Sequence, residues 1–150
     1  MSKKILVIGT LAFDSIQTPS FNSGVILGGA ATYISFAISK ISNNFGIVSV
    51  VGDDFPLEYL NRIKSTGADI SGVDIVKNEQ SFFWSGKYHD NMNTRTTLDT
   101  QLNVLENFKP KIPEHLKSPD FVMLGNLSPD VQLQALEQLN AKPKLTLSLI

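Results

Sequence analysis

Asp14, the pair Gly28–Gly29 and the helical pattern that follows it have the residue types and positions needed to bind hydroxyl groups. An aspartate carboxylate offers two acceptor oxygens to hydroxyls. Two glycines allow a ligand to touch the backbone, and the first turn of the helix predicted from Ala30 presents unpaired N–H donors. Thr32, on that first turn, adds a hydroxyl. The chemistry predicted is binding of hydroxyl groups or of an anion, and the candidate ligand is a small polyol.

Each of these features also has a purely structural explanation. Asp14 follows Gly9 by five residues and can be a solvated aspartate in a turn. The glycine pair can simply make the turn into a helix, and the Thr32 hydroxyl can help to cap that helix. From the residues alone, both explanations remain open.

Asp53 and Asp54 follow a predicted strand, but adjacent carboxylates do not easily chelate one metal ion without further ligands. We expect them instead to complement the amino-terminal end of a helix over 55–65. His89 and His115 have no metal-ligand spacing around them and are expected at the surface. No metal site is predicted.

The chain alternates predicted strands with predicted helices. Short apolar runs end in glycine or are followed by polar residues, which is typical of strands buried in a parallel sheet. Helical spacing separates them, and the helix that follows Asn126 is expected to have Ser128 as its N-cap. The expected strands are 4–9, 46–54, 73–76, 120–126 and 144–150, and the expected helices are 30–42, 55–65 and the segment from 129.

Two segments do not fit this alternation. Residues 81–98 have period-two polarity and a turn near 91–93, which predicts an antiparallel ribbon. Residues 15–27 predict a turn and a peripheral strand. The fold class predicted is therefore α/β: a three-layer, Rossmann-like, mostly parallel sheet within one domain, 1–150, with a projecting antiparallel β lid formed near 15–27 and 81–98. Asp14, Gly28, Gly29 and Asn126 would line one rim of that sheet.

Composition narrows the class of protein. The net charge is -1 with no local basic cluster, so neither nucleic acid nor an anionic membrane is expected as a partner. There is no cysteine, which fits a cytoplasmic location, and no apolar run reaches the ~20 residues that span a bilayer. The sequence has no P-loop, GxGxxG or GxSxG motif.

The sequence resembles the ribokinase-like (PfkB) carbohydrate and nucleoside kinases in the order of four features. These are Asp14, the glycine pair that opens a helix, "VVGDD" after the second strand, and the β ribbon. The resemblance implies that Asp14 accepts hydrogen bonds from sugar hydroxyls, and that the sugar lies against Gly28 and Gly29. Thr32 stands where the family usually has asparagine. Asn126 stands where some relatives have a substrate-contacting carboxylate. The resemblance also implies a lid that can pair two subunits as a homodimer.

Kinases of this family are roughly twice as long, and their second half holds a "GAGD"-type motif with the general-base aspartate. That motif is absent from this sequence. We therefore expect the amino-terminal, substrate-side half of an ATP-dependent sugar kinase, truncated inside the sheet, inactive alone, and without tight binding of ATP or Mg²⁺. The alternatives are a nucleoside kinase of the same fold, or a non-catalytic module for sugar binding or dimerisation.

Overall fold

Five parallel strands form the first sheet, in the order β5-β4-β1-β8-β9. The structure is a computed structural model and describes residues 3–147. The strands are β1 (Ile5–Ile8), β4 (Phe45–Gly52), β5 (Ala68–Val76), β8 (Phe121–Leu124) and β9 (Lys144–Leu147). All eight residues of β4 are buried, because this apolar strand is covered on both faces. The expected strand at 144–150 is present as β9, and residues 148–150 lie outside the described residues.

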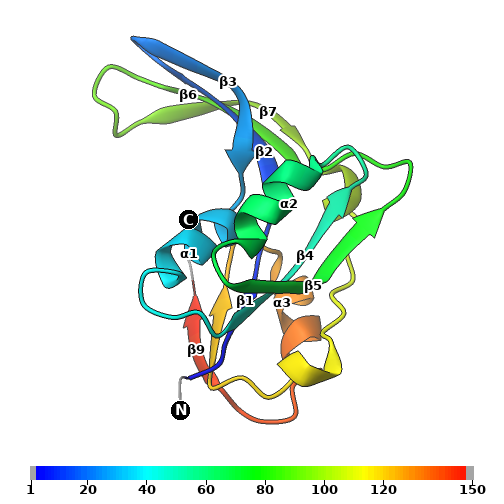
Figure 1. Ribbon diagram of the computed structural model, residues 1–150. Helices are drawn as coiled ribbons and strands as arrows, with labels where there is room; N and C mark the ends of the chain where they lie inside the picture. Colours follow the sequence, from blue (N-terminus) through cyan, green and yellow to red (C-terminus); the bar gives the residue numbers. More distant parts are fainter. Residues whose placement is uncertain (1–2, 148–150) are drawn as a thin grey trace.

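Helices cover both faces of this sheet (Figure 1). They are α1 (Ala30–Ile38), α2 (Leu57–Lys64) and α3 (Pro129–Leu136). Side chains alternate along β1, so Val7 packs into the core on the α1 and α2 side while Leu6 and Ile8 pack into the core on the α3 side. Two short 3₁₀ helices, η1 (Asn103–Leu105) and η2 (Glu114–Leu116), contribute to the α3-side core. The expected three layers are confirmed.

A second sheet of four strands projects from the first sheet (Figure 1). Its order is β3-β2-β6-β7, with β2 (Ala12–Thr18), β3 (Phe21–Gly28), β6 (Phe83–Tyr88) and β7 (Arg95–Gln101). The outer pairs, β2–β3 and β6–β7, are antiparallel hairpins, whereas the central pair β2–β6 is parallel. The ribbon expected at 81–98 is therefore one hairpin, joined to a second hairpin that the sequence indicated only in part.

Some element boundaries differ from the sequence-based expectation. β5 begins at Ala68 and not at residue 73, because Gly67, with φ +93°, ends the turn after α2 and the strand starts immediately. The polar residues of β5 conceal the start of this strand in the sequence pattern. A strand at the edge of the sheet tolerates them, and β5 pairs with β4 on one side only. The α-helical part of α1 ends at Ile38, four residues before the expected end at 42. No helix within residues 3–147 is long and apolar enough to cross a membrane.

Candidate functional site

Asp14 lies in β2, and its carboxylate rests against the backbone of Gly28. Ala12 is the register partner of Gly28, so the Asp14 side chain leans along the hairpin toward the start of α1. A Cβ added at residue 28 would overlap the Asp14 carboxyl group. The absence of a side chain at Gly28 therefore makes room for the carboxylate. The sequence analysis expected Asp14 outside regular strands; the structure places it in the second sheet, opposite Ile26, with its carboxyl group against Gly28.

The electrostatic setting of Asp14 is that of a half-buried acid. Burial raises the pKa of Asp14 above its ordinary value, and a hydrogen bond from the backbone N–H of Gly29 partly offsets this rise. Tyr33, on the first turns of α1, has a raised pKa through burial and, second, through the negative charge of Asp14. A perturbed carboxyl group at the junction of two sheets is a functional-site candidate on physical grounds.

The backbone conformation at residue 29 favours glycine. Its φ of +91° and ψ of 145° lie in a region that is essentially restricted to glycine. A Cβ there would overlap the carbonyl oxygen of Thr10 and lie 2.9 Å from the amide nitrogen of Ala12. This glycine therefore brings the start of α1 onto the segment between β1 and β2, which aligns the helix with Asp14.

Thr10 is a residue that the sequence analysis missed. It is 1% exposed, and its hydroxyl accepts a hydrogen bond from the Ala30 N–H (3.1 Å) while its carbonyl accepts one from the Ala31 N–H (2.9 Å). The expectation that the first turn of α1 presents unpaired donors is thus wrong for these two residues, because Thr10 caps the helix from another segment. A lone threonine after a strand carries no sequence signal for such a role.

Asn126 is held near the start of α1 by a hydrogen bond with Thr10. The Thr10 hydroxyl donates to Oδ1 of Asn126, at 2.8 Å, so one side chain links the start of α1 to the end of β8. Close packing supports this arrangement, since a Cβ at Gly125 would lie 3.3 Å from the Ala30 Cβ. Asn126 is exposed and keeps its amide N–H₂ group available on the rim. Its substrate contact stays a prediction.

Thr32 is buried, at 1% exposed, and its hydroxyl donates to the carbonyl oxygen of Gly28 at 2.7 Å. This bond closes the turn between β3 and α1. This bond is consistent with a structural role at the start of the helix, and a contact of Thr32 with substrate stays a prediction. The Gly28 carbonyl thereby acquires a fixed orientation beside the Asp14 carboxylate.

Asp53 and Asp54 accept hydrogen bonds from the loop after β5. Asp54 Oδ1 accepts from both the amide and the hydroxyl of Ser81, at 2.8 and 2.7 Å, and Asp53 Oδ2 accepts from the amide of Asn78 at 2.9 Å. The expectation that they complement the start of α2 is wrong, because that helix begins at Leu57 with Glu58 as its first-turn acid. These bonds tie the 78–81 loop, which leads into β6, to the first sheet.

The two faces of the second sheet have different roles. Phe13, which projects to the face opposite Asp14, packs against Phe55 with ring centroids 5.3 Å apart and against Tyr59 at 6.3 Å. That face anchors the second sheet to α2. Trp84 is the register partner of Asp14, so Trp84 and Asp14 project from the same face, which is the one opposite Phe13. The candidate site therefore comprises the Asp14 face of the second sheet and the rim formed by Gly29, Thr10 and Asn126.

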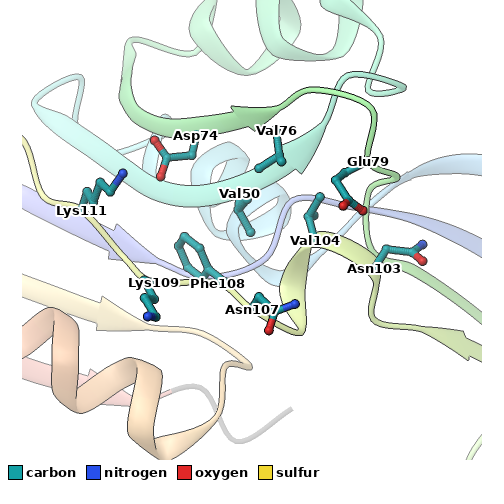
Figure 2. A pocket seen from close by; sticks show the side chains of 10 residues that line it. All are labelled: Val50, Asp74, Val76, Glu79, Asn103, Val104, Asn107, Phe108, Lys109 and Lys111. Carbon is teal, nitrogen blue, oxygen red and sulfur yellow. The ribbon is translucent and has the colours of Figure 1, made fainter.

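A separate cavity of about 310 Å³ lies on the α3 side of the first sheet, between β4, β5 and residues 103–111 (Figure 2). Its floor is apolar, with Val50, Val104 and Phe108 belonging to the α3-side core. None of the residues predicted to bind substrate lines it. Its lining residues are Val50, Asp74, Val76, Glu79, Asn103, Val104, Asn107, Phe108, Lys109 and Lys111.

Comparison with known proteins identifies chains that are similar in sequence or in fold. No family model matches the chain. A cytidine kinase of Thermococcus kodakarensis is 26% identical over 138 residues, which are 92% of this chain and 49% of that protein. Ribokinase of Cryptococcus neoformans, solved in complex with ADP, superimposes with a TM-score of 0.73 at 18% identity, covering 97% of this chain and 50% of that one.

The nucleoside kinase of Methanocaldococcus jannaschii, described as an archaeal member of the ribokinase family, superimposes with a TM-score of 0.74 at 19% identity and covers 97% of this chain and 52% of that one. The chain has the ribokinase fold, and the resemblance indicated by its sequence is confirmed. It spans about half the length of the relatives that it matches.

Proposed function

We propose that this chain forms the substrate-side half of an ATP-dependent kinase that phosphorylates a hydroxyl group of a sugar. The position of Asp14 carries this proposal: its half-buried carboxylate lies against Gly28 and accepts a hydrogen bond from the Gly29 N–H, at the start of α1 in a ribokinase fold. A carboxylate in that place can accept hydrogen bonds from two hydroxyls and orient the polyol. In this proposal the second sheet acts as a lid over the sugar.

In this proposal ATP and Mg²⁺ are bound by the complete kinase and not tightly by this half. Within residues 3–147, no three His, Asp or Glu side chains are grouped to hold a metal ion. The Ala30 and Ala31 amides, which would be the natural phosphate donors at the start of α1, are paired with Thr10. We therefore assign nucleotide binding and the general base to the other half of a complete kinase.

A ligand titration tests the proposal. Trp84 is the single tryptophan of the chain and shares a face with Asp14, so its fluorescence reports ligand entry at that face. We expect D-ribose or D-fructose to change the emission saturably, while a coupled assay of ADP formation shows no turnover above background. Turnover by the 150-residue chain would contradict the half-site assignment, and a flat titration with every sugar would contradict substrate binding.

A nucleoside is the second candidate substrate. It is favoured by the similarity to a cytidine kinase and to a nucleoside kinase. Adding cytidine and adenosine to the same titration separates the two candidates, since a nucleoside kinase should bind at least one nucleoside about tenfold more tightly than free ribose.

We further propose that the second sheet can pair two copies of the chain. Among the described residues, β3 and β7 are its edge strands, and Phe21 and Val25 of β3 are 63% and 62% exposed. An exposed edge with apolar side chains is suited to strand pairing between subunits. Light scattering on the purified chain should give a dimer mass that falls toward the monomer in a Val25→Lys variant; a monomer in both would refute pairing.

A further inference from the structure

An arginine stands on the substrate face of the second sheet, where the proposed function gives it no role. Arg95 begins β7, and its guanidinium carbon lies 5.4 Å from the centre of the Trp84 ring. Trp84 is the register partner of Asp14. The guanidinium is thus stacked on a side chain that projects from the same face as the Asp14 carboxylate.

The position of Trp84 is itself constrained. Its indole lies over Gly86, where an added Cβ would overlap the ring, and its Nε1–H donates to the Thr97 hydroxyl at 3.4 Å. Gly86 is opposite Thr97 in the β6–β7 register, so the indole spans both strands. Arg95 therefore stacks on a ring held by its own sheet, which limits the positions that its guanidinium adopts.

The charge of Arg95 is not neutralised within the protein. Among residues 3–147, Arg95 forms no ion pair with a carboxylate; the ion-paired lysines are Lys3, with Asp120, and Lys117, with Glu114. Asp99 on the same strand is the register partner of Ser85, so it projects to the other face, where it accepts from Gln101. A guanidinium fork without a partner is matched by a carboxylate or phosphate.

Building on the proposed function, we infer that the substrate is an anionic polyol. Its hydroxyls bind at Asp14, and its carboxylate or phosphate group binds at Arg95. The two opposite charges on one face orient such a ligand end to end, since the acidic group is repelled by Asp14 and attracted by Arg95. A neutral sugar would leave the guanidinium with the Trp84 ring and solvent but without an anionic partner.

The test is a fluorescence titration of the unchanged chain with D-ribose, D-gluconate, D-ribose 5-phosphate and inorganic phosphate. We expect one of the two acidic polyols to bind at least about tenfold more tightly than D-ribose, because a hydrogen-bonded charge pair contributes that much or more. Gluconate and ribose 5-phosphate distinguish a carboxylate from a phosphate. Equal affinity for inorganic phosphate and the best acidic polyol would show a simple anion site and overturn the inference.

Substitutions assign the preference to the guanidinium. Arg95→Gln should reduce the ratio of acidic to neutral affinity to within about twofold, and Arg95→Lys should retain part of the ratio because the charge remains without the fork. The matched control is Arg62→Gln. Arg62 also stacks on an aromatic ring, Phe36, at 5.4 Å, but on α2, and its loss should leave the ratio intact.

Failure of this inference differs from failure of the proposed function. D-ribose binding that depends on Asp14, without any preference for an acidic polyol, would overturn the inference alone. Binding that requires Arg95 but is indifferent to Asp14→Asn would overturn the proposed function. Raising the salt concentration should weaken the acidic ligand selectively, because the Arg95 pair is exposed and screened.

Discussion

The Asp14→Asn variant should bind D-ribose and D-gluconate on the order of 100-fold more weakly than the unchanged chain, because hydrogen bonds to a charged acceptor contribute about 1.5–3 kcal/mol each and two hydroxyls are involved. Asparagine keeps the size of the side chain and one acceptor oxygen for the Gly29 amide. The loss therefore reports the charge and the second oxygen. Isothermal titration calorimetry measures it.

The control for this variant is Asp99→Asn, which removes a carboxylate from the opposite face of the same sheet. We expect it to leave both affinities within about twofold of the unchanged chain, as is usual for an exposed polar substitution. Equal effects of the two substitutions would show that the net charge of the sheet matters and not the position of Asp14, and the pocket assignment would then be wrong.

The pH dependence of Asp14 has a defined sign. Its pKa is raised in the folded chain, so the folded state binds a proton more readily than the unfolded state. The contribution of Asp14 to stability is therefore greatest below its ordinary pKa and is lost as the pH rises through the raised value. At neutral pH the Asn variant should melt at the same temperature or higher, while ligand affinity of the unchanged chain should fall as the pH drops through the raised pKa.

Gly29→Ala should cost more than about 3 kcal/mol of unfolding free energy, a large part of the roughly 5–15 kcal/mol that stabilises a typical domain. The backbone of residue 29 has φ +91°, and the added Cβ would overlap the Thr10 carbonyl. The Thr10 carbonyl and the nearby Ala12 amide are backbone groups and not flexible side chains, so the start of α1 must shift. Urea denaturation should show a lower midpoint with an unchanged slope.

Two other glycines provide the comparison. Gly24 also has a positive φ, +60°, but nothing lies within 4 Å of an added Cβ, so Gly24→Ala should cost only about 1 kcal/mol. Gly28→Ala meets the Asp14 side chain, which can rotate away, so it should reduce ligand binding more than stability. Equal destabilisation by Gly24→Ala and Gly29→Ala would contradict the close approach at Thr10.

Local patterns were sufficient to predict three strands of the first sheet, β1, β4 and β8, since these are apolar runs whose character does not depend on distant residues. Ser128 was likewise readable as an N-cap, and its hydroxyl accepts from the Val131 amide at 3.4 Å. The glycine pair and Asp14 were identified from their types and order. The residues between Asp14 and the glycine pair do not indicate that Gly28 accommodates the carboxylate.

The remaining features depend on contacts between distant segments. Thr10 caps α1 across 20 residues, and Ser81 joins Asp54 across 27, which no local spacing encodes. The same holds for the parallel pairing of Phe13–Gln17 with Phe83–Lys87. Arg95 lies in a strand whose residues are all exposed, so only the register and the indole of Trp84 reveal which face it serves.

The parallel pair at the centre of the second sheet has a consequence for how the molecule assembles. β2 and β6 are joined through β3, α1, β4, α2 and β5, so their pairing must close a long stretch of chain. Closing such a loop is entropically costly and slow compared with forming a hairpin. We expect the proposed ligand-binding face to be completed late in folding, only after β4 and β5 have docked, so that a newly made chain acquires its structural core before it acquires affinity.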